Sequence, residues 1–261
     1  MKIFIGKVIF VLSKKLLSFF GYSITLSNSL KSYPELEEHE ENFCLDVYNS
    51  SLTLTSLESL KLLAISAKYV KKVNIVGDFV ETGIWRGGSS IVAKYVLGDS
   101  RTFYLYDTFE GMTEPSDFDY RIGESSAEKT KQKWKALRTT TGNKWVAASL
   151  SEVENNFKRY KLLDTKIKLI KGDVRITLES LQNLPKVISI LRIDTDFYDS
   201  TLISLKKLWP LLTSGGIMIL DDYAHWDGAR RAVDEFFAAN GLSDLLKVPM
   251  AGGGGRFVLK P

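Results

Sequence analysis

Two pairs of aspartates are the residues of this chain best suited to catalytic chemistry. Each pair directly follows a short apolar run, at residues 187–193 and 217–220. The pairs are Asp194 with Asp196, and Asp221 with Asp222. Carboxylates this close in space repel one another unless a cation lies among them. The aspartates therefore predict a cation site built from oxygen ligands, provided that the fold brings the two pairs together.

The segments around these aspartates predict how they would be brought together. Both apolar runs have the length and composition of buried strands in a parallel sheet. A helical segment at 200–212 joins them, followed by the break Ser214-Gly215-Gly216. This order indicates a right-handed crossover between neighbouring strands. Because open α/β sheets bind ligands at the carboxyl ends of their strands, we expect all four carboxylates at that edge.

A glycine-containing turn near residue 80 predicts a second ligand-binding element. We expect a strand at 75–80, a turn at 81–90 and a helix that ends near Leu97. Glycines let the backbone approach a ligand, and a helix amino terminus favours a carboxylate or phosphate. The spacing is not the GxGxxG pattern of dinucleotide-binding enzymes.

An acid after the next predicted strand adds to this interpretation. The strand at 102–106 is followed by Asp107, at a position where a carboxylate can accept both hydroxyls of a ribose. The glycine turn and Asp107 together indicate a ribose-bearing cofactor. A capped surface turn is the alternative.

The remaining segments predict a single α/β core. A helix is expected at 55–72 and the third strand at 167–171. Asp173 either lies near a bound adenine or caps the helix expected at 175–181. The polar stretch at 110–150 is long enough to be a lid or a binding loop. After a helix at 229–239, segments 245–248 and 256–259 predict an antiparallel pair of strands.

The amino-terminal part predicts an extension at 1–50 ahead of a core domain at 51–261. Residues 1–22 are apolar but too short and too interrupted by lysines to span a membrane. We expect a basic amphipathic helix that packs on its own domain, on a dimer partner or on a membrane surface. Residues 28–50 are polar and acidic, which predicts a solvated linker.

Composition excludes some classes of partner and fold. The formal charge of +4 comes without a dense stripe of lysine and arginine, so we expect no nucleic-acid partner. Cys44 is the only cysteine, which excludes an internal disulfide and favours a reducing compartment. The expected location is the cytoplasm, at the inner face of the membrane if residues 1–22 bind lipid.

Five motifs together resemble one family. They are ETGIWRGGSS, YDTFEGM, LRIDTDFYDST, LWPLLTSGGIMILDDY and GARRAVDEFF, in this order between about residues 55 and 240. The sequence is similar to the macrocin O-methyltransferase (TylF-type) family. The resemblance implies a class I methyltransferase: a Rossmann-like α/β fold with a mostly parallel seven-stranded sheet, an antiparallel terminal strand and helices on both faces. It also implies a homo-oligomer of at least two chains.

The resemblance further implies the reaction and its residues. Members use S-adenosylmethionine and Mg²⁺ to methylate a hydroxyl of a sugar in a glycoside, glycan or glycosylated natural product. The implied cofactor-binding residues are Glu81, Thr82, Gly83, Trp85, Ser89, Ser90, Asp107, Thr108, Phe109, Gly172, Asp173, Val174 and Asp194. The implied metal ligands are Asp194, Asp221 and Asp222. Asp196 matches the general base, and His225 is the second candidate for that role.

Three alternatives stay open from the sequence. A haloacid-dehalogenase-like phosphohydrolase also carries a DxD pair, but its pair follows the first core strand, unlike Asp194 and Asp196. A non-catalytic cofactor-binding homologue would share the fold. An O-methyltransferase acting on a catechol-like phenol or another non-sugar diol would share the cation site, because vicinal oxygens bind a metal equally well. Oxygen ligands favour Mg²⁺ over zinc in either enzyme.

Overall fold

The structure, a computed structural model, describes residues 33–250 and 254–261. Residues Glu35–Pro261 form one compact unit, to which all of the following applies. The helix predicted at 1–22 lies outside the described residues. Among the helices that the structure describes, none is both long and apolar enough to cross a membrane.

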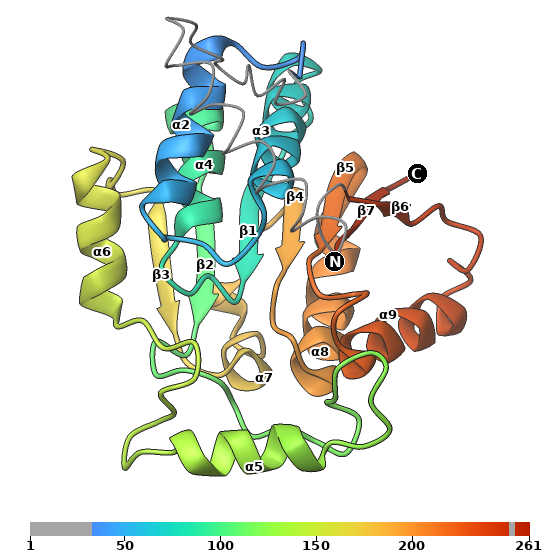
Figure 1. The fold of residues 1–261 in the computed structure, drawn as a ribbon. Coiled ribbons are helices and arrows are strands. Elements are labelled where there is room, and N and C mark those ends of the chain that lie inside the picture. The colour runs from blue at the N-terminus through green and yellow to red at the C-terminus, as the bar shows by residue number, and fades with distance from the viewer. Residues whose placement is uncertain (1–32, 251–253) are drawn as a thin grey trace, which may run out of the picture. The chain divides into compact units, whose positions relative to one another are not determined.

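A seven-stranded sheet with the strand order β3-β2-β1-β4-β5-β7-β6 forms the centre of the fold (Figure 1). The first five strands run parallel, and β7 runs antiparallel to both β5 and β6. The strands are β1 (Asp78–Thr82), β2 (Phe103–Asp107), β3 (Ile167–Lys171), β4 (Ile188–Ile193), β5 (Leu212–Leu220), β6 (Val248–Pro249) and β7 (Arg256–Leu259). This sheet confirms the predicted fold class.

Helices cover both faces of the sheet. They are α2 (Glu38–Asn49), α3 (Leu57–Lys72), α4 (Gly88–Leu97), α5 (Glu128–Leu137), α6 (Leu150–Arg159), α7 (Val174–Thr177), α8 (Tyr198–Leu208) and α9 (Asp227–Ala239). Helices α2, α3 and α4 pack together, and α8 packs against α7 and α9 (Figure 1). Successive side chains of a strand point to opposite faces. Val80 and Leu191 accordingly join the core beneath α8 and α9, whereas Glu81 contacts Ser89 of α4.

Several elements differ from their predicted bounds. Strand β5 starts at Leu212 and not at residue 217, so the break predicted at 214–216 lies within the strand, and β6 covers only Val248–Pro249 instead of 245–248. Strand β1 starts at Asp78, because Gly77 has φ 129° and a side chain there would meet the backbone of Ile188 at 2.6 Å. The strand ends at Thr82 instead of residue 80, so Glu81 and Thr82 belong to the strand and not to the turn. Helix α7 ends at Thr177 instead of residue 181. Helix α8 ends at Leu208, and a short 3₁₀ helix containing Pro210 leads into β5.

The prediction of a solvated linker at 28–50 is wrong for residues Glu38–Asn49, which form helix α2. A capping box formed by Glu37 and Glu40 starts this helix, and Cys44 and Val47 are buried. The acidic side chains that suggested solvation are paired with lysines of the next helix: Glu40 lies 2.7 Å from the ammonium of Lys68, and Glu41 lies 2.9 Å from that of Lys61.

The polar stretch at 110–150 contains helix α5, which the sequence analysis did not predict. Figure 1 shows α5 lying beyond the end of the sheet towards which the parallel strands point. Asp119 fastens the stretch to the core, because its buried carboxylate accepts the backbone N–H of Tyr198 at 2.7 Å and so caps α8. An apolar cluster joins the stretch to α8 and α9. Its buried members are Trp134, Trp145, Phe197, Trp226 and Ala229.

Candidate active site

A cleft of about 890 Å³ opens at the carboxyl ends of the five parallel strands. Each of these strands places a residue in its wall: Gly83 after β1, Asp107 at the end of β2, Gly172 after β3, Asp194 after β4 and Asp221 after β5. The edge of the sheet predicted to bind ligands is thus the one that does form a cleft.

The turn after β1 brings the backbone unusually close to β4. Gly83 has φ 82°, and a Cβ there would lie 1.9 Å from the carbonyl oxygen of Asp194. Further along the turn, Gly88 donates its N–H to the carbonyl of Leu52 at 3.0 Å, and a Cβ on Gly88 would lie 2.5 Å from the same oxygen. The glycines therefore let the turn, the end of β4 and the segment before α3 lie in close contact.

Asp107 is held rigidly at the floor of this end. Its carboxylate accepts the backbone N–H groups of Trp85 and Phe109, each at 2.8 Å. Burial raises the pKa of Asp107, against the lowering effect of these hydrogen bonds. The carboxylate is thus fixed in orientation and can accept hydroxyl groups of a ligand in the cleft.

The cofactor-binding residues implied by the resemblance fall into two groups. Nine line the cleft: Gly83, Trp85, Ser89, Asp107, Thr108, Gly172, Asp173, Val174 and Asp194. Four do not line it: Glu81, Thr82, Ser90 and Phe109, all of them buried. The Glu81 side chain accepts hydrogen bonds from Ser89 and Ser90, and its part in cofactor binding stays a prediction. Asp173 does cap α7, as one of its two predicted roles required.

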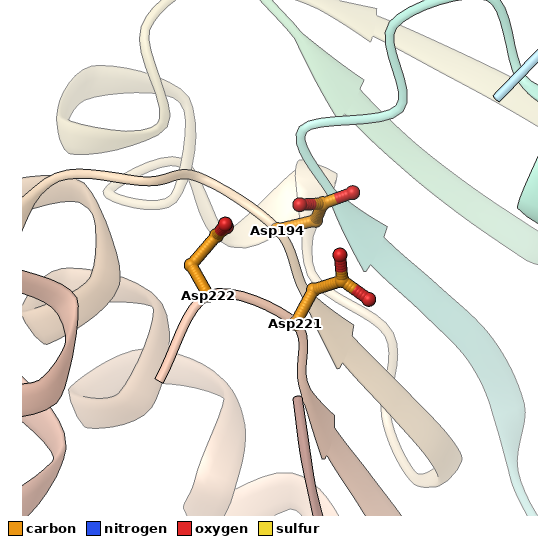
Figure 2. A group of neighbouring side chains, drawn as sticks. All are labelled: Asp194, Asp221 and Asp222. Carbon is orange, nitrogen blue, oxygen red and sulfur yellow. The ribbon is translucent and has the colours of Figure 1, made fainter. Parts of the chain in front are cut away.

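Asp194, Asp221 and Asp222 converge at the other end of the cleft (Figure 2). Each offers one carboxylate oxygen, and the three oxygens lie within 4.8 Å of one another. Burial, together with the charges of Asp221 and Asp222, raises the pKa of Asp194 well above its ordinary value. A cation with hard oxygen ligands fits this donor set, since it would offset the repulsion that raises the pKa.

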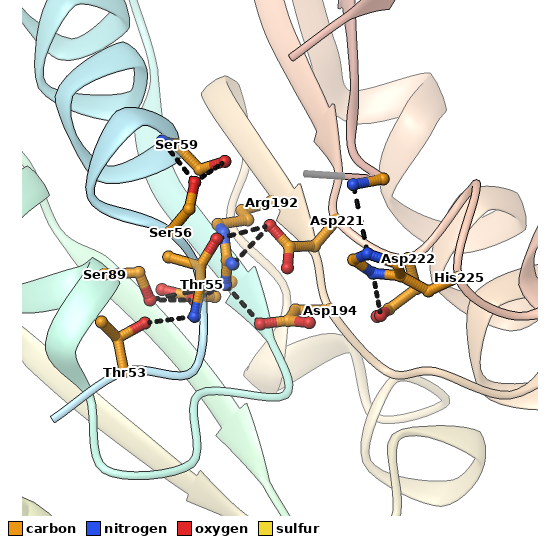
Figure 3. A network of polar contacts seen from close by, with 12 residues as sticks. Thr53, Thr55, Ser56, Ser59, Ser89, Arg192, Asp194, Asp221, Asp222 and His225 are labelled. Carbon is orange, nitrogen blue, oxygen red and sulfur yellow. Dashed lines mark hydrogen bonds and ion pairs between the residues drawn. The ribbon is translucent and has the colours of Figure 1, made fainter. Parts of the chain in front are cut away.

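Arg192 is a cation within this site that the sequence analysis missed. Its side chain is 3% exposed, and its guanidinium lies 2.5 Å from Glu81, 2.6 Å from Asp194 and 2.7 Å from Asp221. Figure 3 shows the contacts of Arg192 with Asp194 and Asp221. An arginine inside the mostly apolar β4 was the available signal, because a charged residue is almost never fully buried unless it is paired.

Both candidate bases lie beside Asp222. The backbone N–H of Asp196 points to the Asp222 carboxylate at 3.3 Å, and His225 Nδ1 lies 3.7 Å from Asp222 Oδ1. Burial and the charge of Asp194 raise the pKa of Asp196 to about 7. On its far side, His225 Nε2 accepts the N–H of Gly254 at 3.2 Å.

Two further groups in the cleft wall were not predicted as site residues. Residues 51–56, between α2 and α3, reach the metal end, where the Thr55 hydroxyl lies 3.5 Å from Asp221 Oδ1 (Figure 3). Trp145 and Trp226 also line the cleft, and the Arg121 guanidinium lies 4.1 Å from the centre of the Trp226 ring. No motif marks these residues, since they reach the site only through tertiary packing.

The strand order, the glycine turn after β1 and the acid at the end of β2 define a class I S-adenosylmethionine-dependent methyltransferase. The sequence matches the Macrocin-O-methyltransferase (TylF) family over residues 12–252. The chain belongs to this family and is an S-adenosylmethionine-dependent O-methyltransferase.

Individual relatives agree with the family match. The chain is 36% identical over 196 residues to 8-demethyl-8-(2,3-dimethoxy-alpha-L-rhamnosyl)-tetracenomycin-C 4'-O-methyltransferase of Streptomyces olivaceus, covering 74% of this chain and 70% of the relative. It is 30% identical over 198 residues to demethyldecarbamoylnovobiocin O-methyltransferase of Streptomyces niveus, covering 74% and 71%. The solved structure of the O-methyltransferase NovP superposes with a TM-score of 0.69 at 28% identity, covering 80% of this chain and 81% of that one.

Proposed function

We propose that this enzyme transfers the methyl group of S-adenosylmethionine to a hydroxyl of a sugar in a glycosylated acceptor, with a Mg²⁺ ion held by Asp194, Asp221 and Asp222. The observation that carries the proposal is the convergence of these three carboxylates in the same cleft as the cofactor turn. A relative named for methylating a rhamnosyl tetracenomycin supports a sugar acceptor.

The cofactor would occupy the end of the cleft formed by the first three strands. The turn from Gly83 to Ser89 surrounds the space for its amino-acid part, with backbone groups at the start of α4. Asp107 would accept the ribose hydroxyls. Gly172 and Val174 border the space for the adenine ring.

The acceptor would occupy the other end, beside the carboxylates. A bound divalent cation would hold two vicinal hydroxyls and favour loss of the proton from the reacting one. The carboxylates of Asp194, Asp221 and Asp222 would hold the ion, and the rings of Trp145 and Trp226 would limit where the sugar can lie. Methyl transfer then needs the hydroxyl opposite the sulfonium, which this shared cleft makes possible.

Asp196 would remove the proton from the acceptor hydroxyl. Without a bound ion, burial and Asp194 raise its pKa to about 7, which makes it a stronger base than an ordinary carboxylate, and a cation on Asp194 would lower this value. His225 is less suited to the role, because its two ring nitrogens face Asp222 and the N–H of Gly254. A nitrogen that already accepts a hydrogen bond is not free to take a substrate proton.

An acceptor screen with methyl-labelled S-adenosylmethionine tests the proposal. The panel would contain deoxysugar glycosides with vicinal hydroxyls, the same glycosides lacking one of the two hydroxyls, and catechols. We expect label on the vicinal-diol glycosides and at least about 100-fold less on their deoxygenated counterparts. Label confined to catechols would contradict the sugar assignment.

A further inference from the structure

Arg192 occupies a place that links the cofactor turn to the candidate metal ligands. We propose that Arg192 is the positioning residue of the metal site, which fixes Asp194 and Asp221 with one oxygen of each available to the ion. This inference rests on the proposed use of a divalent metal. It adds a residue that contacts neither acceptor nor cofactor in the proposed arrangement.

The guanidinium of Arg192 is anchored from behind. Glu81 and Arg192 are directly paired in register across β1 and β4, so their side chains lie on the same face of the sheet. Glu81 is fully buried and lies 2.5 Å from Nη1 of Arg192. Ser89 and Ser90, at the start of α4, donate hydrogen bonds to the same carboxylate. The arginine head group is therefore fixed by the element that also forms the cofactor turn.

The front of the guanidinium holds two carboxylates. Nη1 donates to Asp194 Oδ2 at 2.6 Å, and Nη2 lies 2.7 Å from Asp221 Oδ1. The Thr55 hydroxyl points to the same Asp221 oxygen (Figure 3). Asp194 Oδ2 is thus hydrogen-bonded to the arginine and Asp221 Oδ1 is ion-paired with it, which leaves Asp194 Oδ1 and Asp221 Oδ2 clear of the arginine.

The charges around Arg192 indicate that its guanidinium supports a bound metal ion and does not take the place of one. Three carboxylates, those of Glu81, Asp194 and Asp221, lie within 2.7 Å of the Arg192 guanidinium, which carries a single positive charge. The excess of negative charge leaves room for a divalent ion. Groups that orient metal ligands from behind commonly change metal affinity 10–100-fold when removed. If Arg192 instead competed with the metal ion for the carboxylates, its removal would tighten metal binding.

Binding of Mn²⁺, as a paramagnetic stand-in for Mg²⁺, separates these roles. Free Mn²⁺ would be counted by electron paramagnetic resonance during titration of the full-length protein saturated with S-adenosylhomocysteine. The test variant is the double substitution Arg192→Met with Glu81→Gln, because Arg192→Met alone would leave the buried Glu81 carboxylate without its cation. The matched reference is Glu81→Gln alone, which retains Arg192 beside Asp194 and Asp221.

We expect the double variant to bind Mn²⁺ at least about tenfold more weakly than the Glu81→Gln reference. Calorimetry should find that these two variants bind S-adenosylhomocysteine with affinities within about threefold of each other. A general loss of structure would weaken binding of this ligand as well. Arg192→Lys should also weaken Mn²⁺ binding, since one ammonium cannot hold two carboxylates in the arginine's fork geometry. Wild-type affinity in the lysine variant, or unchanged or tighter binding in the double variant, would overturn the inference. Failure of the wild-type protein to bind Mn²⁺ would instead contradict the metal of the proposed function, and the inference with it.

Discussion

Gly83 and Asp194 lie so close that a methyl group on Gly83 would be 1.9 Å from the Asp194 carbonyl oxygen. Gly83 opens the cofactor turn, and Asp194 supplies a carboxylate to the candidate metal site. The two halves of the active site therefore meet at a backbone contact that only glycine permits. A change on one side of this contact must disturb the other.

Substitution Gly83→Ala should therefore impair both halves of the site together. We expect at least about a tenfold loss of affinity for S-adenosylhomocysteine by calorimetry, with a lower melting temperature. Gly241→Ala is the matched control, because Gly241 also has a positive φ (68°) but has no atom within 4 Å of an added Cβ. That control should lose only the about 1–2 kcal/mol of an unfavourable backbone conformation. Equal effects of the two substitutions on cofactor binding would show that the contact is unimportant.

The assignment of Asp196 as base predicts a loss of turnover without a loss of cofactor binding. Asp196→Asn keeps the shape of the side chain but cannot take a proton, so kcat should fall at least about 100-fold. Affinity for S-adenosylhomocysteine should stay within about threefold by calorimetry. His225→Gln is the comparison, and we expect it to cost no more than about tenfold in kcat. A larger loss in the histidine variant than in Asp196→Asn would reverse the assignment.

Asp119 should hold the 110–150 stretch against the core. Asp119→Ala removes the acceptor for the N–H groups of Tyr198 and Ser116, both bound at 2.7 Å, which should cost about 2 kcal/mol of unfolding free energy. The looser stretch should also be cleaved faster in limited proteolysis. Asp117→Ala is the control, because Asp117 is 87% exposed and pairs with Lys131 at the surface. A protease that cuts both variants at the same rate would argue against the fastening role.

Cys44 should be unreactive in the folded protein. Burial raises the pKa of its thiol to about 12, and the side chain is 1% exposed. A raised pKa means that almost no thiolate is present at pH 8, and the thiolate is the reactive form. A thiol reagent such as Ellman's should therefore label the chain only after denaturant is added. Stoichiometric labelling within minutes in buffer alone would contradict this burial.

The sequence predicted best those features that depend on local pattern. Strand β3 forms at the predicted residues 167–171, and the aspartates after β4 and β5 meet at one edge because adjacent parallel strands end together. The convergence of Asp194, Asp221 and Asp222 therefore follows from the order of strands and helices along the chain. The expectations for residues 1–22, for the oligomer and for the metal remain predictions.

Features that depend on distant partners were missed. Helix α2 was interpreted as a linker because its acids resemble a solvated stretch, yet the lysines that pair with Glu40 and Glu41 lie on α3. Arg192 was passed over because its partner Glu81 is 111 residues away. Glu81 itself was placed in the cofactor turn, since β1 was predicted to end at residue 80 but continues to Thr82. No local pattern contains this information.

Dependence on a divalent metal tests the account most directly. Enzyme treated with EDTA and then dialysed would be assayed for transfer of labelled methyl groups to a glycoside acceptor, before and after addition of Mg²⁺. We predict at least about a 100-fold loss of activity after EDTA treatment and recovery on addition of Mg²⁺. An Asp221→Asn variant should show little activity under either condition. Methyl transfer that is undiminished by EDTA would contradict the metal role of Asp194, Asp221 and Asp222.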